Sequence, residues 1–190
     1  MNSQSNLSPG ESLDFLRLLS KQFPSIQSVC TEIINLEAIL DLPKGTEHFI
    51  SDLHGEYEAV AHILNNASGV IREKIDLLYA DTVSEEERSK LATLIYYPHH
   101  KLASLRAEHA DDLSSWYHET LVRLIDICRV VASKYTRSKV RKALPPDFSY
   151  IIDELLHADH YEKNKESYYR RIFSTIVDVG RADAFITALS

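Results

Sequence analysis

Apolar residues recur every three or four positions along most of this 190-residue chain, and this helical period constrains the fold more than any other feature. From residue 67 onward the period is broken at glycine, proline and short polar stretches, and no convincing strand interrupts it. The chain is therefore predicted to be mainly α. Helices are expected over 112–135, 137–144, 149–157, 165–179 and 182–190.

Two further amphipathic helices are expected before residue 45. Ser8 and Pro9 begin a capping-box pattern with proline at the first helical position, and this helix should end at Phe23. A second apolar stripe runs over 26–40 and stops at a Pro-Lys-Gly turn.

One stretch between these helical regions, residues 46–56, has the pattern of a short buried strand followed by a turn into a helix. Asp52 and His54 lie at its end, and Gly55 has no Cβ where the chain must turn sharply. Residues i and i+2 of an extended backbone point to the same side, so the carboxylate and the imidazole can converge on one ion. Such a ligand pair suits manganese, iron or zinc. The alternative is that Asp52 caps the helix and His54 is a turn residue.

A single buried strand cannot satisfy its own backbone donors and acceptors. Either a second strand is hidden in a segment predicted to be helical, or the partner strands lie outside this chain. The apolar stretch 182–190 favours the second option because it stops without a glycine, asparagine or basic cap. We therefore expect a piece of a longer protein, and its exposed apolar surface and unpaired strand favour a homo-oligomer.

Composition excludes some classes of function. Lysine and arginine number 21 against 28 aspartates and glutamates, and the net charge of -7 argues against a general nucleic-acid binder. Cys30 and Cys128 have no C-x-x-C spacing and lie within helical apolar patterns, which predicts reduced core thiols. No basic leader and no membrane-length apolar run is present, so a cytoplasmic location without a membrane is expected.

The segment Ser51-Asp52-Leu53-His54-Gly55-Glu56-Tyr57 resembles the first motif of the calcineurin-like metallophosphoesterases, in which the aspartate and the histidine bind one of two metals. Residues 49–66, 96–101 and 135–145 resemble the N-terminal part of the class III, Firmicutes-type fructose-1,6-bisphosphatases. The resemblance covers most of the chain, from the helix at Ser8 onward.

This resemblance implies a helical bundle-like segment attached to an incomplete α/β metallophosphoesterase core of one strand-helix unit. The expected division is N-terminal helices over 1–45, the first strand, metal motif and helix of the core over 46–66, and a helical insertion over 67–190. The family's later Gly-Asp and Gly-Asn-His motifs are absent, because the five glycines are followed by Glu, Thr, Glu, Val and Arg.

The resemblance also implies the activity of the complete enzyme. It would be a manganese-dependent hydrolase of gluconeogenesis that converts fructose 1,6-bisphosphate and water to fructose 6-phosphate and phosphate, with Asp52 and His54 among the ligands of a binuclear site. This chain is expected to be inactive by itself, with at most partial metal occupancy, because most of the ligands are missing. The alternative is a non-catalytic helical module that binds a partner or senses an effector.

Further histidines are candidates for binding. His99, His100 and Lys101 follow a proline and are possible phosphate or effector contacts, although adjacent residues rarely converge on one ion, and a loop or helix start is the alternative. His157 and His160 have the spacing of one helix face, but the residues between them also predict a solvated turn.

The acidic chain contains one basic cluster. It could contact a phosphorylated sugar, an anionic effector or an acidic face of a missing domain, and a solvated helix flank is the alternative. Its members are Lys134, Arg137, Lys139, Arg141 and Lys142.

Overall fold

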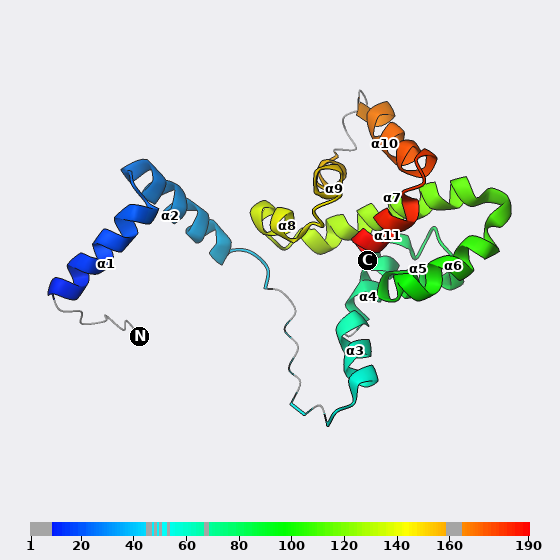
Figure 1. Ribbon diagram of the computed structural model, residues 1–190, viewed down its shortest axis with the longest axis horizontal. Coiled ribbons are helices and arrows are strands. Elements are labelled where there is room, and N and C mark those ends of the chain that lie inside the picture. The colour runs from blue at the N-terminus through cyan, green and yellow to red at the C-terminus, as the bar shows by residue number, and fades with distance from the viewer. Residues whose placement is uncertain are drawn as a thin grey trace. The chain divides into compact units, whose positions relative to one another are not determined.

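The computed structural model describes residues 9–44, 47, 49, 51–52, 54–66, 69–158 and 165–190. The chain forms two units, Met1–Lys44 and Gly45–Ser190. Every regular element in the described part is a helix, and this part contains no β-strand (Figure 1). The prediction of a mainly α chain is therefore confirmed.

The first unit contains α1 (Pro9–Gln22) and α2 (Ile26–Leu40), with the predicted boundaries. Ser25 caps α2: its Oγ accepts a hydrogen bond from the Ser28 backbone N–H at 3.1 Å, and the Ser28 Oγ accepts one from the Ser25 N–H at 3.2 Å. No described residue of either helix is buried. Large apolar side chains are instead exposed on both, namely Leu13, Phe15, Leu16, Leu18, Ile26, Val29, Ile33, Ile34, Leu36, Ile39 and Leu40.

The two cysteines differ in exposure, which corrects one prediction. Both are free thiols, but Cys30 on α2 is exposed while Cys128 is partly buried. The apolar stripe of α2 was correctly identified, but α2 has no buried residue and Cys30 is exposed, so Cys30 does not belong to a core.

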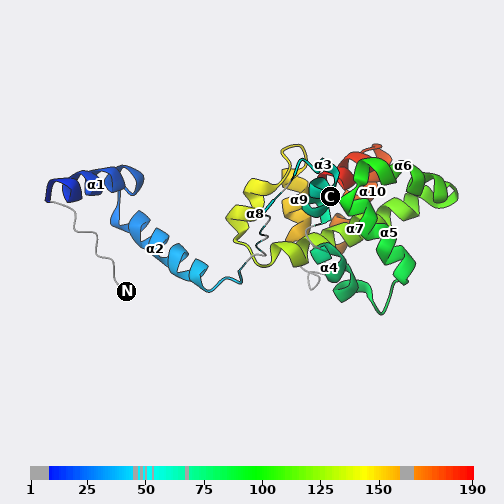
Figure 2. The same ribbon diagram turned by 90° about the horizontal axis from the view of Figure 1, so that it is seen from below.

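The second unit is a bundle of short helices around one long helix, α7 (Leu113–Ala132). α7 packs against α4, α9, α10 and α11, as Figure 1 and the perpendicular view in Figure 2 show. The other elements of this unit are α3 (Tyr57–Asn66), α4 (Val70–Tyr79), α5 (Glu85–Tyr96), α6 (Pro98–Glu108), the 3-10 turn η2 (Ala110–Asp112), α8 (Arg137–Ala143), α9 (Ser149–Leu156), α10 (Glu166–Asp178) and α11 (Ala182–Leu189).

The core of the second unit lies along α7 and continues into α11. Phe185 on α11 is fully buried, and its ring meets that of Phe148 edge-on with the centroids 5.0 Å apart. Burying such side chains removes apolar surface from water and is the main force that holds the helices together. The other fully buried side chains are Ile75, Leu94, Leu121, Leu124, Ile125, Ile152, Leu155 and Ile186.

Local signals set the helix boundaries in this unit. Ser84 begins α5, and its Oγ accepts a hydrogen bond from the Glu87 N–H at 3.2 Å. Pro98 opens α6, where a missing backbone donor costs nothing. Gly180 has a φ of 70° and separates α10 from α11, a backbone conformation that favours glycine.

The predicted strand before α3 is not present among the described residues. Glu47, Phe49 and Ser51 belong to no strand, and Phe49 is 92% exposed, whereas the prediction required burial. His48 and Ile50 lie outside the described residues. The physical reason is that a strand needs a paired neighbour, and the described part of the chain offers none.

No helix within the described residues is both long enough and apolar enough to cross a membrane.

Candidate functional site

The predicted metal ligands Asp52 and His54 lie in the segment that leads into α3. His54 has a φ of 46°, and Gly55 follows with a φ of 76°. Two successive left-handed residues turn the chain sharply; glycine adopts this conformation freely, whereas histidine adopts it at a cost. Glu56, and not Asp52, immediately precedes α3, so Asp52 is not the N-cap of that helix.

The turn brings the two side chains together. Nε2 of His54 lies 2.9 Å from Oδ2 of Asp52, and the side chains are 78% and 67% exposed, respectively. They lie close together because of a turn with a left-handed histidine, whereas the prediction assumed an extended backbone and an ion between them. Both side chains are largely exposed, so ions and further ligands can reach them from solvent.

The chemistry of this pair fits part of a metal site. A separation of 2.9 Å is that of a hydrogen bond or ion pair between the imidazole and the carboxylate, and the same nitrogen and oxygen are ligand types that transition metals accept. Within the described residues, however, no group of three or more His, Cys, Asp or Glu side chains is placed to hold an ion. The pair therefore supplies two ligands, fewer than a stable site contains.

A histidine that the sequence analysis did not single out connects α3 to the bundle. Nδ1 of His62 contacts the hydroxyl of Tyr97, and the two rings stack with their centroids 6.1 Å apart. Nε2 of His62 lies 2.9 Å from Nδ2 of Asn66. Because Tyr97 immediately precedes α6, this contact ties the helix after Asp52 and His54 to the helix that carries His99. The i, i+4 spacing of His62 and Asn66 was the only sequence signal.

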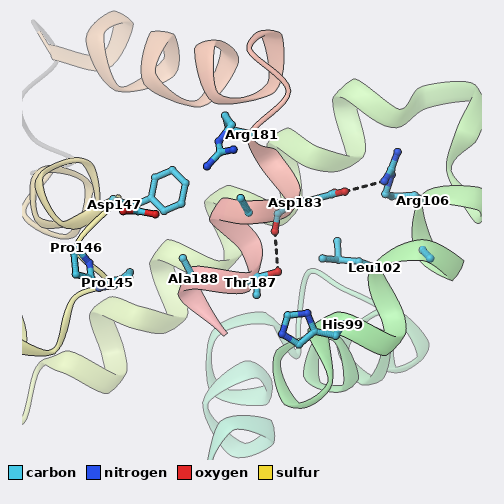
Figure 3. Close-up of a pocket in the computed structure, with 13 residues that line it drawn as sticks. His99, Leu102, Arg106, Pro145, Pro146, Asp147, Arg181, Asp183, Thr187 and Ala188 are labelled. Atoms are coloured by element: carbon cyan, nitrogen blue, oxygen red, sulfur yellow. Dashed lines mark hydrogen bonds and ion pairs between the residues drawn. The ribbon is translucent and has the colours of Figure 1, made fainter.

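His99 lines a groove of about 660 Å³ between α6, α11 and the loop before α9 (Figure 3). Arg106 and Asp183 form an ion pair at 2.8 Å in this groove, and the Arg181 guanidinium lies 5.9 Å from the centre of the Phe148 ring. His100 and Lys101 do not line the groove. None of these three candidates on α6 joins Asp52 and His54 in a cluster of metal ligands.

Charge in this groove is balanced. Its described lining contains two arginines and two aspartates, and Asp183 also accepts a hydrogen bond from the Tyr117 hydroxyl at 2.5 Å. A balanced groove has no strong preference for an anion.

The basic cluster gathers around Tyr135 and Asp153. Nη2 of Arg137 and Nε of Arg141 lie 3.8 and 3.6 Å from Oδ2 of Asp153. Nζ of Lys139 lies 4.7 Å from the centre of the Tyr135 ring. Nζ of Lys134 also lies near this ring, 5.8 Å from its centre. Four of the five cluster members therefore lie near either Tyr135 or Asp153. The fifth, Lys142, is exposed at the end of α8.

Comparisons with known proteins agree on one family. Residues 14–190 match the family described as Firmicute fructose-1,6-bisphosphatase. The chain is 58% identical over 178 residues to the class 3 fructose-1,6-bisphosphatase of Clostridium novyi, an alignment that covers 94% of this chain and 27% of that protein. It is 56% identical over 180 residues to the Clostridium tetani protein and 55% identical over 181 residues to the Alkaliphilus metalliredigens protein of the same name, in each case over 95% of this chain and 27% of the relative.

No solved structure matches the chain. The chain spans about a quarter of the length of these curated relatives, since each alignment covers 27% of the relative. Because the family match extends over nearly all of the sequence and the identities exceed one half, this chain belongs to the Firmicute fructose-1,6-bisphosphatase family.

Proposed function

We propose that this chain is the N-terminal part of a class 3 fructose-1,6-bisphosphatase, which hydrolyses fructose 1,6-bisphosphate to fructose 6-phosphate and phosphate in gluconeogenesis. The observation that carries this proposal is the 58% identity, over 94% of the chain, to a protein of that name. The sugar bisphosphate is then the substrate of the complete enzyme.

Asp52 and His54 would hold one manganese ion of a binuclear site. Bound metal would supply Lewis acidity toward a phosphoryl oxygen and a more acidic water. The chain contributes an anionic oxygen and an imidazole nitrogen 2.9 Å apart, held by the turn at His54 and Gly55. His62 positions α3 behind this turn through its contact with Tyr97.

The segment 46–66 would form the first strand-helix unit of an α/β metallophosphoesterase core, between N-terminal helices over 1–45 and a helical insertion over 67–190. The family match supports this proposal, because the chain covers only 27% of a full-length relative, so most of such a core would come from residues outside this chain. The strand would then pair with residues beyond this chain.

Phosphate release from fructose 1,6-bisphosphate tests the proposal. With manganese present, the 190-residue chain should release no more phosphate than buffer does, because two ligands cannot form the site. A full-length protein that carries this segment should be active, and Asp52→Ala in that protein should abolish the activity. Strong activity of the short chain would contradict the incomplete site, and an unaffected full-length variant would contradict the role of Asp52.

Manganese binding gives an independent measurement. Calorimetric titration of the short chain should show weak binding that Asp52→Ala abolishes, whereas Asp14→Ala, which changes a carboxylate of similar exposure on α1, should leave it unchanged. Manganese binding that neither substitution changes would count against the Asp52 and His54 site.

The second candidate function is that of a helical module that binds a partner, and the exposed apolar side chains of α1 and α2 favour it. A second copy of the chain is the simplest partner, which gives a homo-oligomer. Sedimentation over a range of concentrations should then show reversible association, and Leu16→Glu with Ile33→Glu should prevent it. A chain that stays monomeric at all concentrations would remove this candidate.

A further inference from the structure

A pocket of about 290 Å³ lies between the end of α7, α8 and α9. Its lining contains two arginines, one histidine, one serine and one tyrosine, and none of its described lining residues is an aspartate or glutamate. This composition is unusual for a chain with a net charge of -7. The lining residues are Arg129, Ala132, Ser133, Tyr135, Arg137, Val140, Leu156 and His157.

A single carboxylate, that of Asp153, lies near three basic side chains at the edge of this pocket. Oδ2 of Asp153 lies 3.8 Å from Nη2 of Arg137 and 3.6 Å from Nε of Arg141, and its Oδ1 lies 3.4 Å from Nδ1 of His157. All three separations exceed the usual length of a hydrogen bond between nitrogen and oxygen, which is about 2.7–3.2 Å. Asp153 therefore neutralises only part of the local positive charge.

The two arginines at the edge remain available to a ligand. The side chains of Arg137 and Arg141 are 63% and 66% exposed, while that of Asp153 is 20% exposed. Among the described residues, neither guanidinium has a hydrogen bond or an ion pair other than its long contact with Asp153. Their N–H groups can thus donate to an anion that approaches from solvent.

One lining residue on α7, Arg129, is held in place by hydrogen bonds. Arg129 donates from Nη1 to Oδ1 of Asp126 at 2.7 Å and from Nη2 to the Leu155 carbonyl at 2.6 Å. Two ammonium groups add positive charge beside the pocket, because both Lys139 and Lys134 lie against the Tyr135 ring. Side chains already fixed by the fold lose less entropy when a ligand binds.

Three other pockets formed by described residues differ in that their linings include aspartate or glutamate. The groove that contains His99 has two arginines and two aspartates. A pocket along α10 has Arg170 and Arg171, but Glu166 pairs with Arg170 at 2.6 Å. A third pocket, between α9 and α10, is lined mainly by apolar side chains.

We propose that the pocket between α7, α8 and α9 binds the phosphoryl group of a small phosphate monoester. Arg137, which lines the pocket, donates hydrogen bonds to the phosphoryl oxygens, since the planar guanidinium fork matches the spacing of two such oxygens. Arg141 is not part of the lining, but it lies near the same Asp153 carboxylate and adds a second donor at the edge. The volume of about 290 Å³ lies at the lower end for metabolite pockets and so favours a small molecule. This site involves neither Asp52 nor His54, so it does not depend on the proposed catalytic function.

Titration of the 190-residue chain with inorganic phosphate and with glycerol 3-phosphate, at constant ionic strength, tests the proposal. Two-dimensional NMR should show saturable shifts confined to residues 129–157 for both probes. Arg137→Gln should weaken binding roughly tenfold or more, because it removes charged hydrogen bonds to the anion. The matched control is Arg170→Gln, which changes an arginine of similar exposure that is paired with Glu166 and should leave affinity unchanged.

A second variant tests the proposal even if Arg137→Gln disturbs the fold. Asp153→Asn removes the carboxylate that competes with the ligand and should tighten binding severalfold, whereas local unfolding would weaken it. The proposal is overturned if neither probe saturates, if both arginine variants lose affinity equally, or if Asp153→Asn weakens binding. Binding of inorganic phosphate without glycerol 3-phosphate would overturn the assignment to a monoester.

Discussion

The hydroxyl of Tyr117 on α7 donates a hydrogen bond to Oδ1 of Asp183 on α11, and the two oxygens are 2.5 Å apart. Oδ2 of the same carboxylate pairs with Arg106 on α6 at 2.8 Å. Three helices therefore meet at one side chain. Burial of Tyr117, together with its hydrogen bond to Asp183 and the negative charge there, raises the pKa of its hydroxyl to about 12.

Replacing Tyr117 by phenylalanine should lower the free energy of unfolding by about 1 kcal/mol. The loss is limited because Asp183 keeps its ion pair with Arg106 and is not left alone. Urea unfolding followed by circular dichroism measures the change. The control, Tyr57→Phe, alters a tyrosine that is 81% exposed and should have no measurable effect. Equal effects of the two substitutions would mean that the Asp183 contact does not stabilise the bundle.

The free energy of unfolding should fall at alkaline pH because the same tyrosine, Tyr117, ionises. The pKa of Tyr117 rises from 10.0 to about 12 on folding, so its contribution is complete below about pH 10 and is lost as the pH rises toward about 12. Urea midpoints measured across this interval should decline less steeply for Tyr117→Phe than for the unaltered chain. Parallel declines would show that other groups, such as lysines, account for the whole effect.

The same substitution at two leucines should separate the core from the surface. Leu121 on α7 is 0% exposed, and Leu121→Ala should cost about 2–5 kcal/mol because a cavity remains in the bundle. Leu77 on α4 is 71% exposed, and Leu77→Ala should change the unfolding free energy by less than about 1 kcal/mol. Chemical denaturation of both variants checks this, and a large loss for Leu77 would reveal an unrecognised contact.

The two cysteines should react with a thiol reagent at very different rates. Cys30 on α2 is exposed. Sγ of Cys128 lies 3.9 Å from the Leu189 carbonyl, and burial raises the pKa of this thiol to about 11, so little reactive thiolate forms near neutral pH. One thiol should react quickly in the native chain and the second only on unfolding. Cys30→Ser should remove the fast phase, and its persistence would place Cys128 at the surface.

Helix positions were predictable from the sequence because they depend on neighbours in the chain. The stripe over 26–40, the serine cap before Glu85 and the glycine between α10 and α11 all act within a few residues, and the structure has helix boundaries there. The burial of Cys30 was predicted wrongly for a related reason. A periodic pattern shows that one face of a helix is apolar, but it does not show which element covers that face.

The candidate site was predictable only in part. The residue types of Asp52 and His54 could be read from the sequence, but they come together through a left-handed φ at His54, a conformation that is rare for residues other than glycine and that the i, i+2 spacing does not predict. The contact between His62 and Tyr97 joins residues 35 positions apart, and no local pattern predicts it. Pairing of the basic cluster with Asp153 depends in the same way on how α8 packs near α9.

The exposure of the apolar side chains of α1 and α2 affects how the first unit forms its helices. They contain 14 and 15 residues, a length at which isolated helices are only marginally stable in water. With no described side chain buried, they depend on local interactions such as the capping box of α2 and the Arg17–Asp14 pair of α1. The helical content of residues 9–40 should therefore increase when another surface covers their apolar side chains, so that coil-to-helix conversion and assembly become a single coupled equilibrium.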